Sequence, residues 1–558
     1  MKIIKKIKLE LAQAMEIAVE LEEFPKKEIP GIHIEIPADR INGEISSNIA
    51  LVSAKIFKMS PQKIAQILID NLNLKDDLSK FIDKIEIANV GFINFFLSEN
   101  FYIKVLSKID ELKNNYGKSN FGQNKNILVE FVSSNPTGPM HLGNARLGAI
   151  GDILSEILKF AGFKVYKEFY INDSGNQIKK FSESLAARYM QIFRPETPFP
   201  EDGYHGDDIK FHAQDFAKIH ANYFLDKPEL KGIITNFALP KNIEKIKCIL
   251  GKYKIFYDNW FYESEIHKSD QINKIINKLK NLGFIYKENG AIWFATNKIQ
   301  GYESSKNEVL IRSNGIPTYF MADIAYHANK FLTRNFEICI NIWGADHHGH
   351  IDRMHAAMLA LGIEKKRLKI IIVQLVRIIK NGEINKMSKR SGNSETLESL
   401  LDVINVDSAK FIFNTQTADS KMDFDLNLAV KNDILNPAYY VQYAYARINS
   451  IIRKQINFLM DFKKIDIKIL DSKEERELIF ALSMFPYKIV ESAKLYDTTK
   501  ITRYVTSLSA LFHKFYNSKK IICQDEQLSR ARLFLCVQIS QVIKNVLTIM
   551  KVNLRESM

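Results

Sequence analysis

The sequence lacks any run of eighteen apolar residues, so it offers no candidate transmembrane helix. Cysteine is also scarce, with 4 cysteines in 558 residues and no C-x-x-C pair among them. Such wide spacing supports neither a disulfide framework nor a thiolate zinc site, and it suits a reducing compartment. The four positions are Cys248, Cys339, Cys523 and Cys536.

The first residues lack the uninterrupted apolar core of a signal peptide. Lysines and apolar residues are present there, but five glutamates interrupt them, at Glu10, Glu16, Glu20, Glu22 and Glu23. The pattern favours an amphipathic first helix, and we expect a cytoplasmic protein.

Acidic residues are outnumbered by basic ones. There are 64 Asp and Glu against 78 Lys and Arg, which gives a formal net charge of +14. An excess of cations suggests a polyanionic partner, because neutralised phosphates release counterions. A composition bias of the source genome is an equally open explanation.

Residues 1–115 are predicted to form a separate domain of helices and strands. A serine N-cap followed by proline predicts a helix over residues 60–73, and the apolar run 91–98 predicts a buried strand. The polar, asparagine-rich stretch 111–126 is predicted to be a linker.

Residues 116–400 alternate strands with helices. A strand, a loop, a helix and a second strand follow one another at 127–132, 133–143, about 144–161 and 162–173, and another helix begins near residue 175. Further strands are predicted at 291–295, 309–312, 338–343 and 370–376. This is the βαβ pattern of a parallel sheet that binds its ligand at the carboxyl ends of the strands. We therefore predict an α/β fold with a Rossmann-type catalytic core.

Two further regions depart from this alternation. Residues 194–210 are rich in proline, glycine and acidic residues, and predict an insertion that carries its own helices to about residue 285. From about residue 400 onward no strands are predicted, and helical spacing dominates. Residues 401–558 are predicted to form an all-helical domain.

The loop "SSNPTGPMHLGN" (133–144) lies between a predicted strand and a predicted helix. Glycines there let the backbone approach a phosphate, and the helix start directs its N–H groups to the same place. His141 and Asn144, three residues apart, can both donate to phosphate oxygens that gain charge in a transition state. A structural turn with a satisfied histidine is the alternative for this motif alone.

A second motif, "NKMSKRSGN" (385–393), follows a predicted strand and a polar turn. Lys386, Lys389 and Arg390 could neutralise a departing pyrophosphate from a mobile loop. An ordinary solvated basic loop is the alternative.

The two motifs in this order resemble the signature pair of class I aminoacyl-tRNA synthetases. The stretch "VEFVSSNPTGPMHLGNARLGAIGD" (129–152) is similar to the corresponding stretch of arginyl-tRNA synthetases. Later blocks of that family are resembled by "GADHHGH", "QYAYARINS", "FHKFYNS" and the terminal "VLTIMKVNLRESM". Its extra N-terminal domain is resembled by "NGEISSNIALVSAKIFKMSPQKIA".

The resemblance implies a two-step reaction. ATP and L-arginine give arginyl-adenylate and pyrophosphate, and the terminal ribose of tRNA for arginine then takes the arginyl group. The implied catalytic residues are His141, Asn144, Lys386 and Lys389. The implied ATP-binding residues are Pro136, Thr137, Gly138, Pro139, Met140, His141, Leu142, Gly143, Asn144, Gly344, Asp346, His347, Met387 and Ser388.

The arginine substrate needs fixed carboxylates for its planar guanidinium. Tyr319 and Asp323 share one face if their segment is helical, and the resemblance assigns them to the guanidinium. Glu130, Ser134 and Asn135, at the end of the first strand, are assigned to the rest of the amino acid.

Four residues, Asp346, His347, His348 and His350, present a competing metal-site pattern, which would favour a metal-dependent hydrolase. Adjacent histidines at a strand end point to opposite faces, however, so one metal could take only some of them. The resemblance places Gly344, Asp346 and His347 beside the adenosine instead. We expect no structural zinc, and magnesium that accompanies ATP without a dedicated protein cage.

In the predicted helical domain, aromatic residues alternate with a cation in a pattern that suits stacking on unpaired bases. The members are Tyr439, Tyr440, Tyr443, Tyr445 and Arg447. Such a stripe can equally belong to the core, and we expect a mixture in which Tyr440, Tyr443 and Arg447 contact tRNA. His513, Phe515 and Tyr516 are expected to be packing residues.

One position departs from the family pattern: the first signature usually ends in a second histidine, and here residue 144 is asparagine. An amide can still donate to phosphates or ribose, so we expect activity to be retained. We also expect a monomer that requires bound tRNA before it activates arginine, and no membrane partner. A catalytically idle RNA-binding relative is the other alternative, against which the presence of Lys386 and Lys389 argues.

Overall fold

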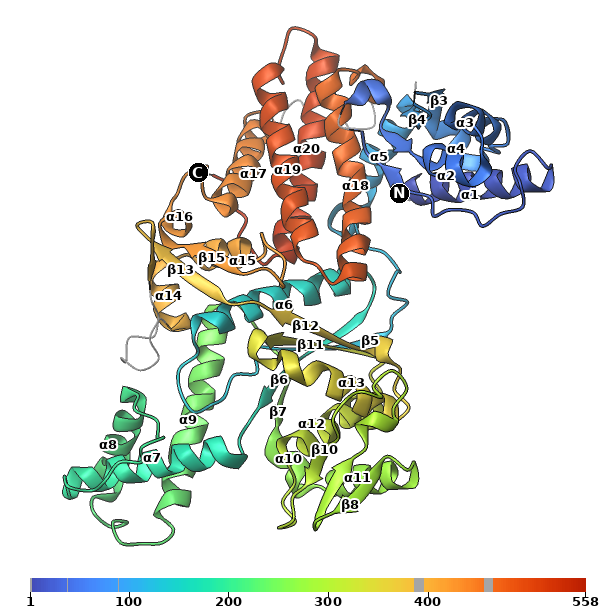
Figure 1. Ribbon diagram of the computed structural model, residues 1–558. Helices are drawn as coiled ribbons and strands as arrows, with labels where there is room; N and C mark the ends of the chain where they lie inside the picture. Colours follow the sequence, from blue (N-terminus) through green and yellow to red (C-terminus); the bar gives the residue numbers. More distant parts are fainter. Residues whose placement is uncertain (1–2, 38, 89, 386–395, 456–464, 558) are drawn as a thin grey trace.

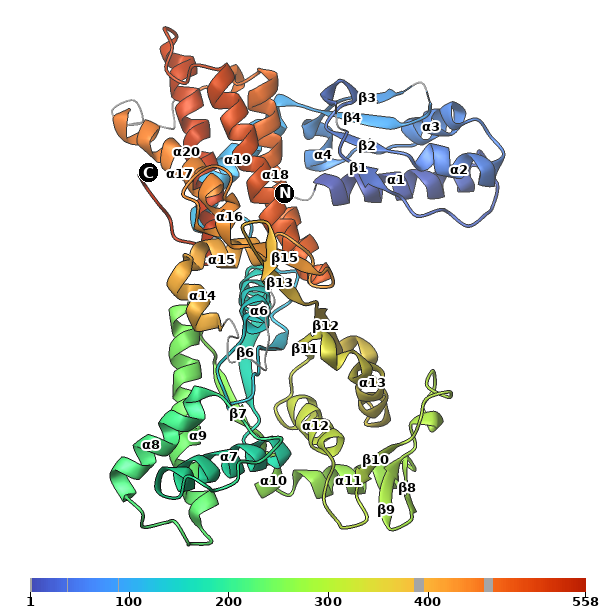
Figure 2. The ribbon, with the colours of Figure 1, turned by 60° about the vertical axis from the view of Figure 1, so that its left-hand side comes forward.

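The computed structural model describes residues 3–37, 39–88, 90–385, 396–455 and 465–557. Figures 1 and 2 show an N-terminal part beside a bundle of long helices, with a central sheet below both. Two lobes project from the far side of that sheet, one built on α7–α9 and the other on α10–α12 and β8–β10.

The N-terminal part is an antiparallel sheet of order β1-β2-β4-β3 covered by helices. The expected helix begins where its caps predict, because the Ser60 side chain accepts from the Lys63 N–H and Pro61 takes the first helical position. The amphipathic first helix is confirmed, with Ile7 and Leu11 on its buried face. The elements are α1 (Ile3–Glu20), β1 (Ile34–Glu35), β2 (Ile45–Ser47), α2 (Ile49–Phe57), α3 (Pro61–Asp70), α4 (Asp76–Phe81), β3 (Ile82–Ile87), β4 (Ile93–Leu97) and α5 (Glu99–Leu112).

The central sheet has five parallel strands in the order β12-β11-β5-β6-β7. Because the chain leaves β5 in one direction for β6 and later returns to its other side with β11, the carboxyl ends of β5 and β11 border a crevice where ligands bind in such sheets. The parallel α/β core is therefore confirmed. The elements are β5 (Asn126–Phe131), α6 (Leu142–Phe160), β6 (Lys164–Ile171), β7 (Asn259–Tyr262), α12 (Tyr319–Ala328), β11 (Ile338–Gly344), α13 (Ile351–Ala360) and β12 (Leu368–Val373).

The insertion carries its own helices, as expected, but it also holds a strand that was not predicted. Its helices are α7 (Gly175–Phe193), α8 (Asp207–His220) and α9 (Leu230–Lys252), but the next strand, β7, returns to the central sheet as an edge strand. Four residues of mixed aromatic and polar type carry too little periodicity to separate such a strand from its helical surroundings.

The strands predicted at 291–295 and 309–312 exist but belong to a different sheet. They are β9 (Ala291–Phe294) and β10 (Glu308–Ile311), which pair antiparallel with each other and, through β9, with β8 (Ile285–Glu288). Before them come α10 (Glu263–Lys268) and α11 (Gln271–Asn281).

The strand predicted at 370–376 is divided between two sheets, since β12 ends at Val373 and β13 (Val376–Lys380) starts a new one. In that sheet β13 pairs with β14 (Glu383–Asn385) and with β15 (Met422–Asp425). A strand at 422–425 contradicts the expectation that strands end near residue 400. The helices around it are α14 (Leu397–Val403), α15 (Val406–Phe413) and α16 (Leu426–Val430).

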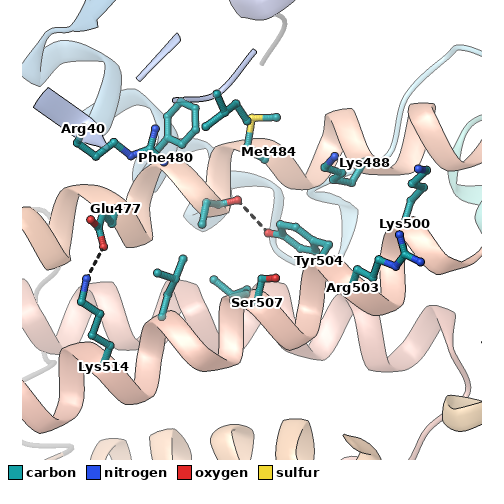
Figure 3. A pocket seen from close by; sticks show the side chains of 14 residues that line it. Arg40, Glu477, Phe480, Met484, Lys488, Lys500, Arg503, Tyr504, Ser507 and Lys514 are labelled. Carbon is teal, nitrogen blue, oxygen red and sulfur yellow. Dashed lines mark hydrogen bonds and ion pairs between the residues drawn. The ribbon is translucent and has the colours of Figure 1, made fainter. Parts of the chain in front are cut away.

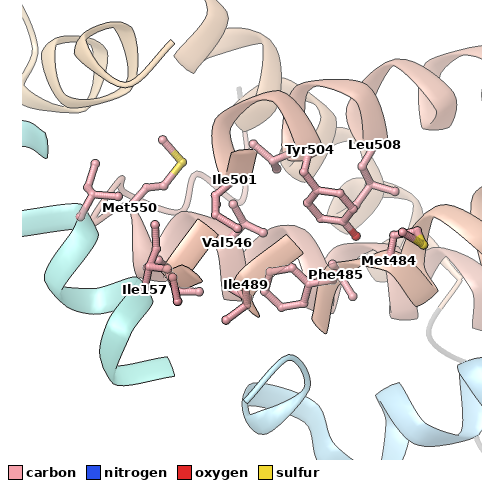
Figure 4. Close-up of a cluster of buried hydrophobic side chains, with 14 of the residues drawn as sticks. Ile157, Met484, Phe485, Ile489, Ile501, Tyr504, Leu508, Val546 and Met550 are labelled. Carbon is pink, nitrogen blue, oxygen red and sulfur yellow. The ribbon is translucent and has the colours of Figure 1, made fainter. Parts of the chain in front are cut away.

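The helical bundle consists of α17 (Pro437–Lys454), α18 (Lys473–Leu495), α19 (Thr499–Ser518) and α20 (Glu526–Ile549). Helix α20 is long and apolar enough to span a membrane by length and composition, yet 78% of that apolar window is buried inside the structure. Figure 4 shows its Val546 in one apolar cluster with Phe485 of α18, Ile501 of α19 and Ile157 of α6. The bundle and the central sheet therefore share a continuous core.

The predicted linker is packed rather than extended. Tyr116 is buried and donates to the Leu482 carbonyl of α18 at 3.0 Å. The Asn545 amide of α20 donates to the carbonyls of Lys113 and Tyr116. This connection thus fixes the N-terminal part against the bundle.

Helix α6 is anchored by a buried carboxylate. Asp152 accepts from Lys410 of α15 at 2.7 Å, from Lys551 of the C-terminal tail at 2.7 Å and from Lys167 of β6 at 3.2 Å. Burial alone raises the pKa of Asp152, but the three ammonium groups together hold it below its usual value. One residue of α6 therefore joins the central sheet, α15 and the C-terminal tail.

We expect Asp152→Asn to lower the free energy of unfolding by about 3–5 kcal/mol, because it leaves buried ammonium groups without a carboxylate. The measurement is the urea midpoint at pH 7, with Glu156→Gln as control. Glu156 lies one turn along the same helix in partly exposed ion pairs, so its loss should cost below about 1 kcal/mol. Since the folded pKa is depressed, the gap between wild type and Asp152→Asn should close as the pH falls below about 4. Equal midpoints for Asp152→Asn and Glu156→Gln at pH 7 would contradict the anchoring role.

Candidate active site

The carboxyl end of β5 carries Glu130, whose buried carboxylate holds neighbouring elements together. It accepts from Lys330 at 2.5 Å and from Asn341 of β11 at 3.0 Å. Lys330 is fully buried in the π-helical turn after α12. Glu130 is thus a fixed, ion-paired charge beneath the crevice between β5 and β11.

A second carboxylate, Asp323 on α12, has no hydrogen-bond or ion-pair partner for its side chain among the described residues. Burial, followed by the negative charges of Glu263 and Glu130, raises the pKa of Asp323 to about 7. Glu263 begins α10 directly after β7, and it accepts from Ser174 at 2.8 Å. Three acidic side chains therefore lie near one another, and we call this cluster the acidic pocket. Glu130 is paired with Lys330, whereas Asp323 has no ion pair among the described residues.

Aromatic hydroxyls border this acidic pocket. Burial, then Glu263 and Asp323, raises the pKa of Tyr170, so its hydroxyl stays a neutral donor. Tyr319 opens α12 one turn before Asp323, as expected, and is 47% exposed. Its hydroxyl accepts from the Asn176 N–H at 2.6 Å, at the start of α7.

A second buried carboxylate, on β6, holds the elements around the acidic pocket together. Glu168 of β6 is fully buried and accepts both guanidinium nitrogens of Arg334, the Tyr326 hydroxyl at 2.7 Å and the Asn259 amide at 2.7 Å. Asn341 also contacts the His327 ring at 3.0 Å, and burial, followed by the charge of Lys330, lowers the pKa of His327 far below its usual value.

The chain turns sharply after β5. Val132 and Ser133 have φ of +69° and +39°, a left-handed conformation that costs energy for residues with a side chain, most of all for β-branched valine. The Ser133 hydroxyl donates to Glu130 and accepts from the Tyr170 N–H, which holds the turn in place. The Ser134 hydroxyl is buried and has no partner among the described residues.

Helices α8 and α9 of the insertion hold the loop that follows this turn. Asn242 of α9 donates to the Pro136 carbonyl at 2.9 Å, and its own oxygen contacts the His212 ring of α8 at 2.7 Å. Within the loop, Thr137, Met140 and Leu142 are buried, whereas Asn135, Pro139 and His141 are exposed and Gly138 is half-buried.

Helix α6 begins with a reciprocal cap. The Asn144 side-chain oxygen accepts from the His141 N–H at 3.0 Å, and Asn144 is buried while His141 is exposed. The two side chains therefore occupy different environments at the helix start. A Cβ added at Gly143 would come within 3.2 Å of the His141 ring, which favours glycine between them.

The histidine cluster has a different backbone from the one expected. Residues 345–350 form a 3-10 helix rather than a strand end, so the argument from opposite strand faces does not apply. His347 is 54% exposed and lies 3.8 Å from Asp346, beyond hydrogen-bond distance. In the described part of the chain no group of three His, Cys, Asp or Glu side chains could hold a metal ion. Gly344 ends β11 just before this turn.

The second signature, with Lys386, Met387, Ser388 and Lys389, lies outside the described residues. Its two flanks are described. Strand β14 ends at Asn385, and Leu397 donates to the Met140 carbonyl at 2.8 Å beside a bridge between Thr396 and His141.

In the bundle, α17 and α19 share an aromatic face with one cation. Arg447 donates to the Tyr443 hydroxyl at 2.5 Å and stacks on Tyr443 and Tyr516, while Tyr440 and Tyr443 both contact the His513 ring. Tyr445 and Phe515 are buried. Packing is thus confirmed for Phe515, whereas Tyr516 packs against Phe512 and Arg447 and is also 38% exposed.

Between the N-terminal part and the bundle lies a cavity of about 630 Å³ (Figure 3). Its apolar floor includes Phe480 and Leu508, both buried. Five cations and one acid line it, namely Arg40, Lys488, Lys500, Arg503, Lys514 and Glu477. Lys514 pairs with Glu477 at 3.0 Å, and Arg40 stacks on Phe480. We call this cavity the interdomain groove.

Comparison with known proteins gives matches along the whole chain. The family models that match are "tRNA synthetases class I (R), catalytic domain" over residues 106–434, "Arginyl tRNA synthetase N terminal domain" over 2–97 and "DALR anticodon binding domain" over 441–558. An arginine–tRNA ligase of Caldanaerobacter subterraneus subsp. tengcongensis is 45% identical over 535 residues, which are 95% of this chain and 94% of that protein. That of Ruminiclostridium cellulolyticum is 45% identical over 97% of this chain and 96% of its own.

Among solved structures, the Thermus thermophilus arginyl-tRNA synthetase superposes with a TM-score of 0.77 over 99% of this chain and 100% of its own, at 19% identity. The matched catalytic domain and the parallel sheet make this chain a class I aminoacyl-tRNA synthetase. More narrowly, it belongs to the arginyl-tRNA synthetase family. Its reaction is the ATP-dependent charging of tRNA with arginine.

Four residues of the pocket were missed by sequence reasoning. Glu263 follows the overlooked strand β7, and an acid directly after the aromatic run "NWFY" was the available signal. Lys330, Asn341 and Tyr170 gave no signal, because a lysine, an amide or a tyrosine in an apolar segment is common and only the fold brings these three together.

Asp323 provides a test of the pocket in the ligand-free protein. Because its folded pKa is raised from an unfolded value near 4 to about 7, its contribution to stability is complete only below about pH 4 and is lost progressively between about pH 4 and pH 7. We therefore expect Asp323→Asn to melt above wild type by a margin that grows between pH 5 and pH 7 and stays constant at higher pH.

Thermal melts across that range are the measurement, with Asp226→Asn as control. Asp226 is exposed, and Arg194 lowers its pKa, so its variant should show no trend between pH 5 and 8. A pH-independent gap for Asp323→Asn would show that the carboxyl does not titrate in this range.

Proposed function

We propose that the acidic pocket between α10 and α12 binds the guanidinium of arginine, with Asp323, Glu263 and Tyr319 around it. The observation that supports this most directly is the carboxylate of Asp323, which lacks a countercharge beside two further acids. A planar cation with five N–H donors supplies both the charge and the paired hydrogen bonds that such carboxylates accept.

The remainder of arginine is assigned to the turn after β5. Ser134 offers a buried hydroxyl without a partner, and Asn135 offers an exposed amide one residue later. Since Lys330 already neutralises Glu130, we assign Glu130 the role of a fixed charge under the pocket rather than a direct hydrogen-bond partner of the α-amino group.

The phosphates of ATP are assigned to the start of α6. His141 is exposed there, and the first N–H groups of the helix point toward the same place, as helix starts that bind phosphate do. Asn144 would contribute chiefly by capping, because its oxygen accepts from the His141 N–H. The loop residues 136–143, together with Met387 and Ser388, complete the phosphate site, and Gly344, Asp346 and His347 border the adenosine. Magnesium arrives with ATP as a substrate complex.

Adenylate formation then needs positioning and charge stabilisation rather than acid–base chemistry. A carboxylate oxygen of arginine attacks the α-phosphorus in line, a new P–O bond forms, and the bond to the bridging oxygen breaks as pyrophosphate leaves. Lys386 and Lys389 stabilise the departing pyrophosphate. A terminal ribose hydroxyl of tRNA next attacks the arginyl carbonyl and releases AMP.

We assign tRNA binding to two surfaces. The face of Tyr440, Tyr443 and Arg447 offers aromatic rings and a cation to unpaired bases, and Tyr516 extends it. The interdomain groove offers cations to the phosphate backbone at the border of residues 1–115 and the bundle. All these surfaces lie on a single chain, so we propose that the protein acts as a monomer. We also propose that it is cytoplasmic and that it requires bound tRNA for arginine activation.

The arginine assignment predicts coupled proton release. Because guanidinium binding favours ionised Asp323, arginine affinity should rise between pH 6 and 8, with release of up to one proton near pH 6.5. Asp323→Asn should weaken arginine binding at least about 30-fold, since removing one partner of a buried charge pair costs about 2–5 kcal/mol. Calorimetric titration with arginine in two buffers of different ionisation enthalpy measures both quantities.

Glu263→Gln should also weaken arginine binding, while Glu265→Gln, two residues along α10 and exposed, should leave it unchanged. ATP affinity should stay within twofold of wild type in all three variants. A large loss of ATP affinity in Asp323→Asn, or an equal effect of both glutamate variants, would contradict the assigned pocket.

The tRNA assignment predicts a salt-dependent loss of affinity. We expect Arg503→Glu, in the interdomain groove, to weaken tRNA binding. The slope of log affinity against log salt concentration should become shallower by about 1, because one phosphate contact is lost. Filter binding at several salt concentrations is the measurement. Lys366→Glu serves as control, because Lys366 is an exposed lysine in the 3-10 turn before β12 and does not line the groove. Charging at saturating tRNA should stay normal, and equal salt slopes for the two variants would exclude the groove from the interface.

A further inference from the structure

Arg146, in the second turn of α6, is a fully buried cation that forms no direct ion pair in the described part of the chain, although the charge of Asp419 acts on it. Its guanidinium donates to three backbone carbonyls, from Nη1 to Gln374 at 2.9 Å and Ser420 at 2.8 Å, and from Nη2 to Thr417 at 2.8 Å. Burial lowers the pKa of Arg146 to about 10, so it remains charged at neutral pH. Burying a charge without a directly paired carboxylate is expensive, and the three carbonyl dipoles compensate it only when they are placed accurately.

The three carbonyls belong to two segments that lie side by side. Gln374 connects β12 to β13, and residues 417–420 lead into β15. These segments also bond to each other, since Gln374 donates to the Ala418 carbonyl and Met422 to the Leu375 carbonyl. Arg146 therefore holds the start of α6 against the root of the sheet β14-β13-β15.

That sheet leads directly to the second signature. β13 pairs with β14, which ends at Asn385, the residue before Lys386. On the other side of the undescribed segment, Leu397 donates to the Met140 carbonyl and Thr396 bridges His141. The two described flanks of the second signature are thus both tied to the first, one of them through Arg146.

We infer that Arg146 is a positioning residue for adenylate formation, one that sets the distance between the phosphate-binding start of α6 and the sheet leading to Lys386. The inference rests on the proposed roles of His141, Lys386 and Lys389. The planar fork of arginine reaches three carbonyls from two segments, and lysine, with one ammonium group, cannot reproduce that geometry. Transfer of arginine from the adenylate to tRNA needs no contact with pyrophosphate, so the effect should be confined to the first step.

The experiment compares Arg146→Lys with Arg532→Lys in the full chain at a temperature where both variants are folded. Arg532 is a matched control, a buried arginine in the bundle that donates to Glu475 and to the Lys520 carbonyl. For Arg146→Lys we expect adenylate formation, measured by single-turnover kinetics with tRNA present, to slow by about 100-fold, the loss that a misplacement of about 1 Å produces. Arginine affinity and the rate of transfer from preformed arginyl-adenylate should stay within twofold of wild type.

Arg532→Lys should lower the melting temperature and leave both chemical steps unchanged. If Arg146→Lys slows both steps alike, or slows neither, Arg146 has only a structural role and the inference is overturned. Arg146→Gln, a neutral side chain of similar length, gives the same comparison if the lysine variant does not fold. Lys389→Ala tests the proposed function separately, because normal adenylate formation in that variant would remove the role of the second signature whatever Arg146 does.

Discussion

A single buried carboxylate on α6 connects the parts of this enzyme. Asp152 takes three ammonium groups from β6, α15 and the C-terminal tail, and each would be costly to bury without it. The same helix starts after the loop 133–141, and its Arg146 bonds to the segments that lead into β13 and β15. Because so many contacts converge on α6, the helical bundle and the loop beside the crevice are attached to the same helix.

The acidic pocket shows the opposite use of buried charge. Glu130 and Glu168 are neutralised within the fold, by Lys330 and Arg334, and hold strands and helices in place. Asp323 is left without such a partner, and burial, followed by the charges of Glu263 and Glu130, raises its pKa. The protein tolerates this unpaired carboxylate in the free state, and in the proposed function the guanidinium of arginine supplies the missing countercharge.

The sequence predicted the parallel core, the N-terminal domain and the helical bundle, since long periodic elements and capping residues such as Ser60 are locally encoded. It did not predict β7 or β15, because four-residue strands show little periodicity and are defined by the strands they join. The aromatic face on α17 was anticipated, but the placement of Tyr516 beside Arg447 depends on how α19 packs.

Local pattern and family resemblance were enough to identify the family and the class of reaction, because the two signatures depend on glycines, histidine and lysines close together in the chain. The tertiary structure alone decided how the charges are shared. Glu130 is paired and Asp323 is not, Asn144 caps the helix start while His141 faces solvent, and Glu263 joins a pocket whose other residues lie far away in sequence. Electrostatic roles of this kind depend on burial and on distances between residues that are remote in the sequence, and neither can be predicted from the local sequence.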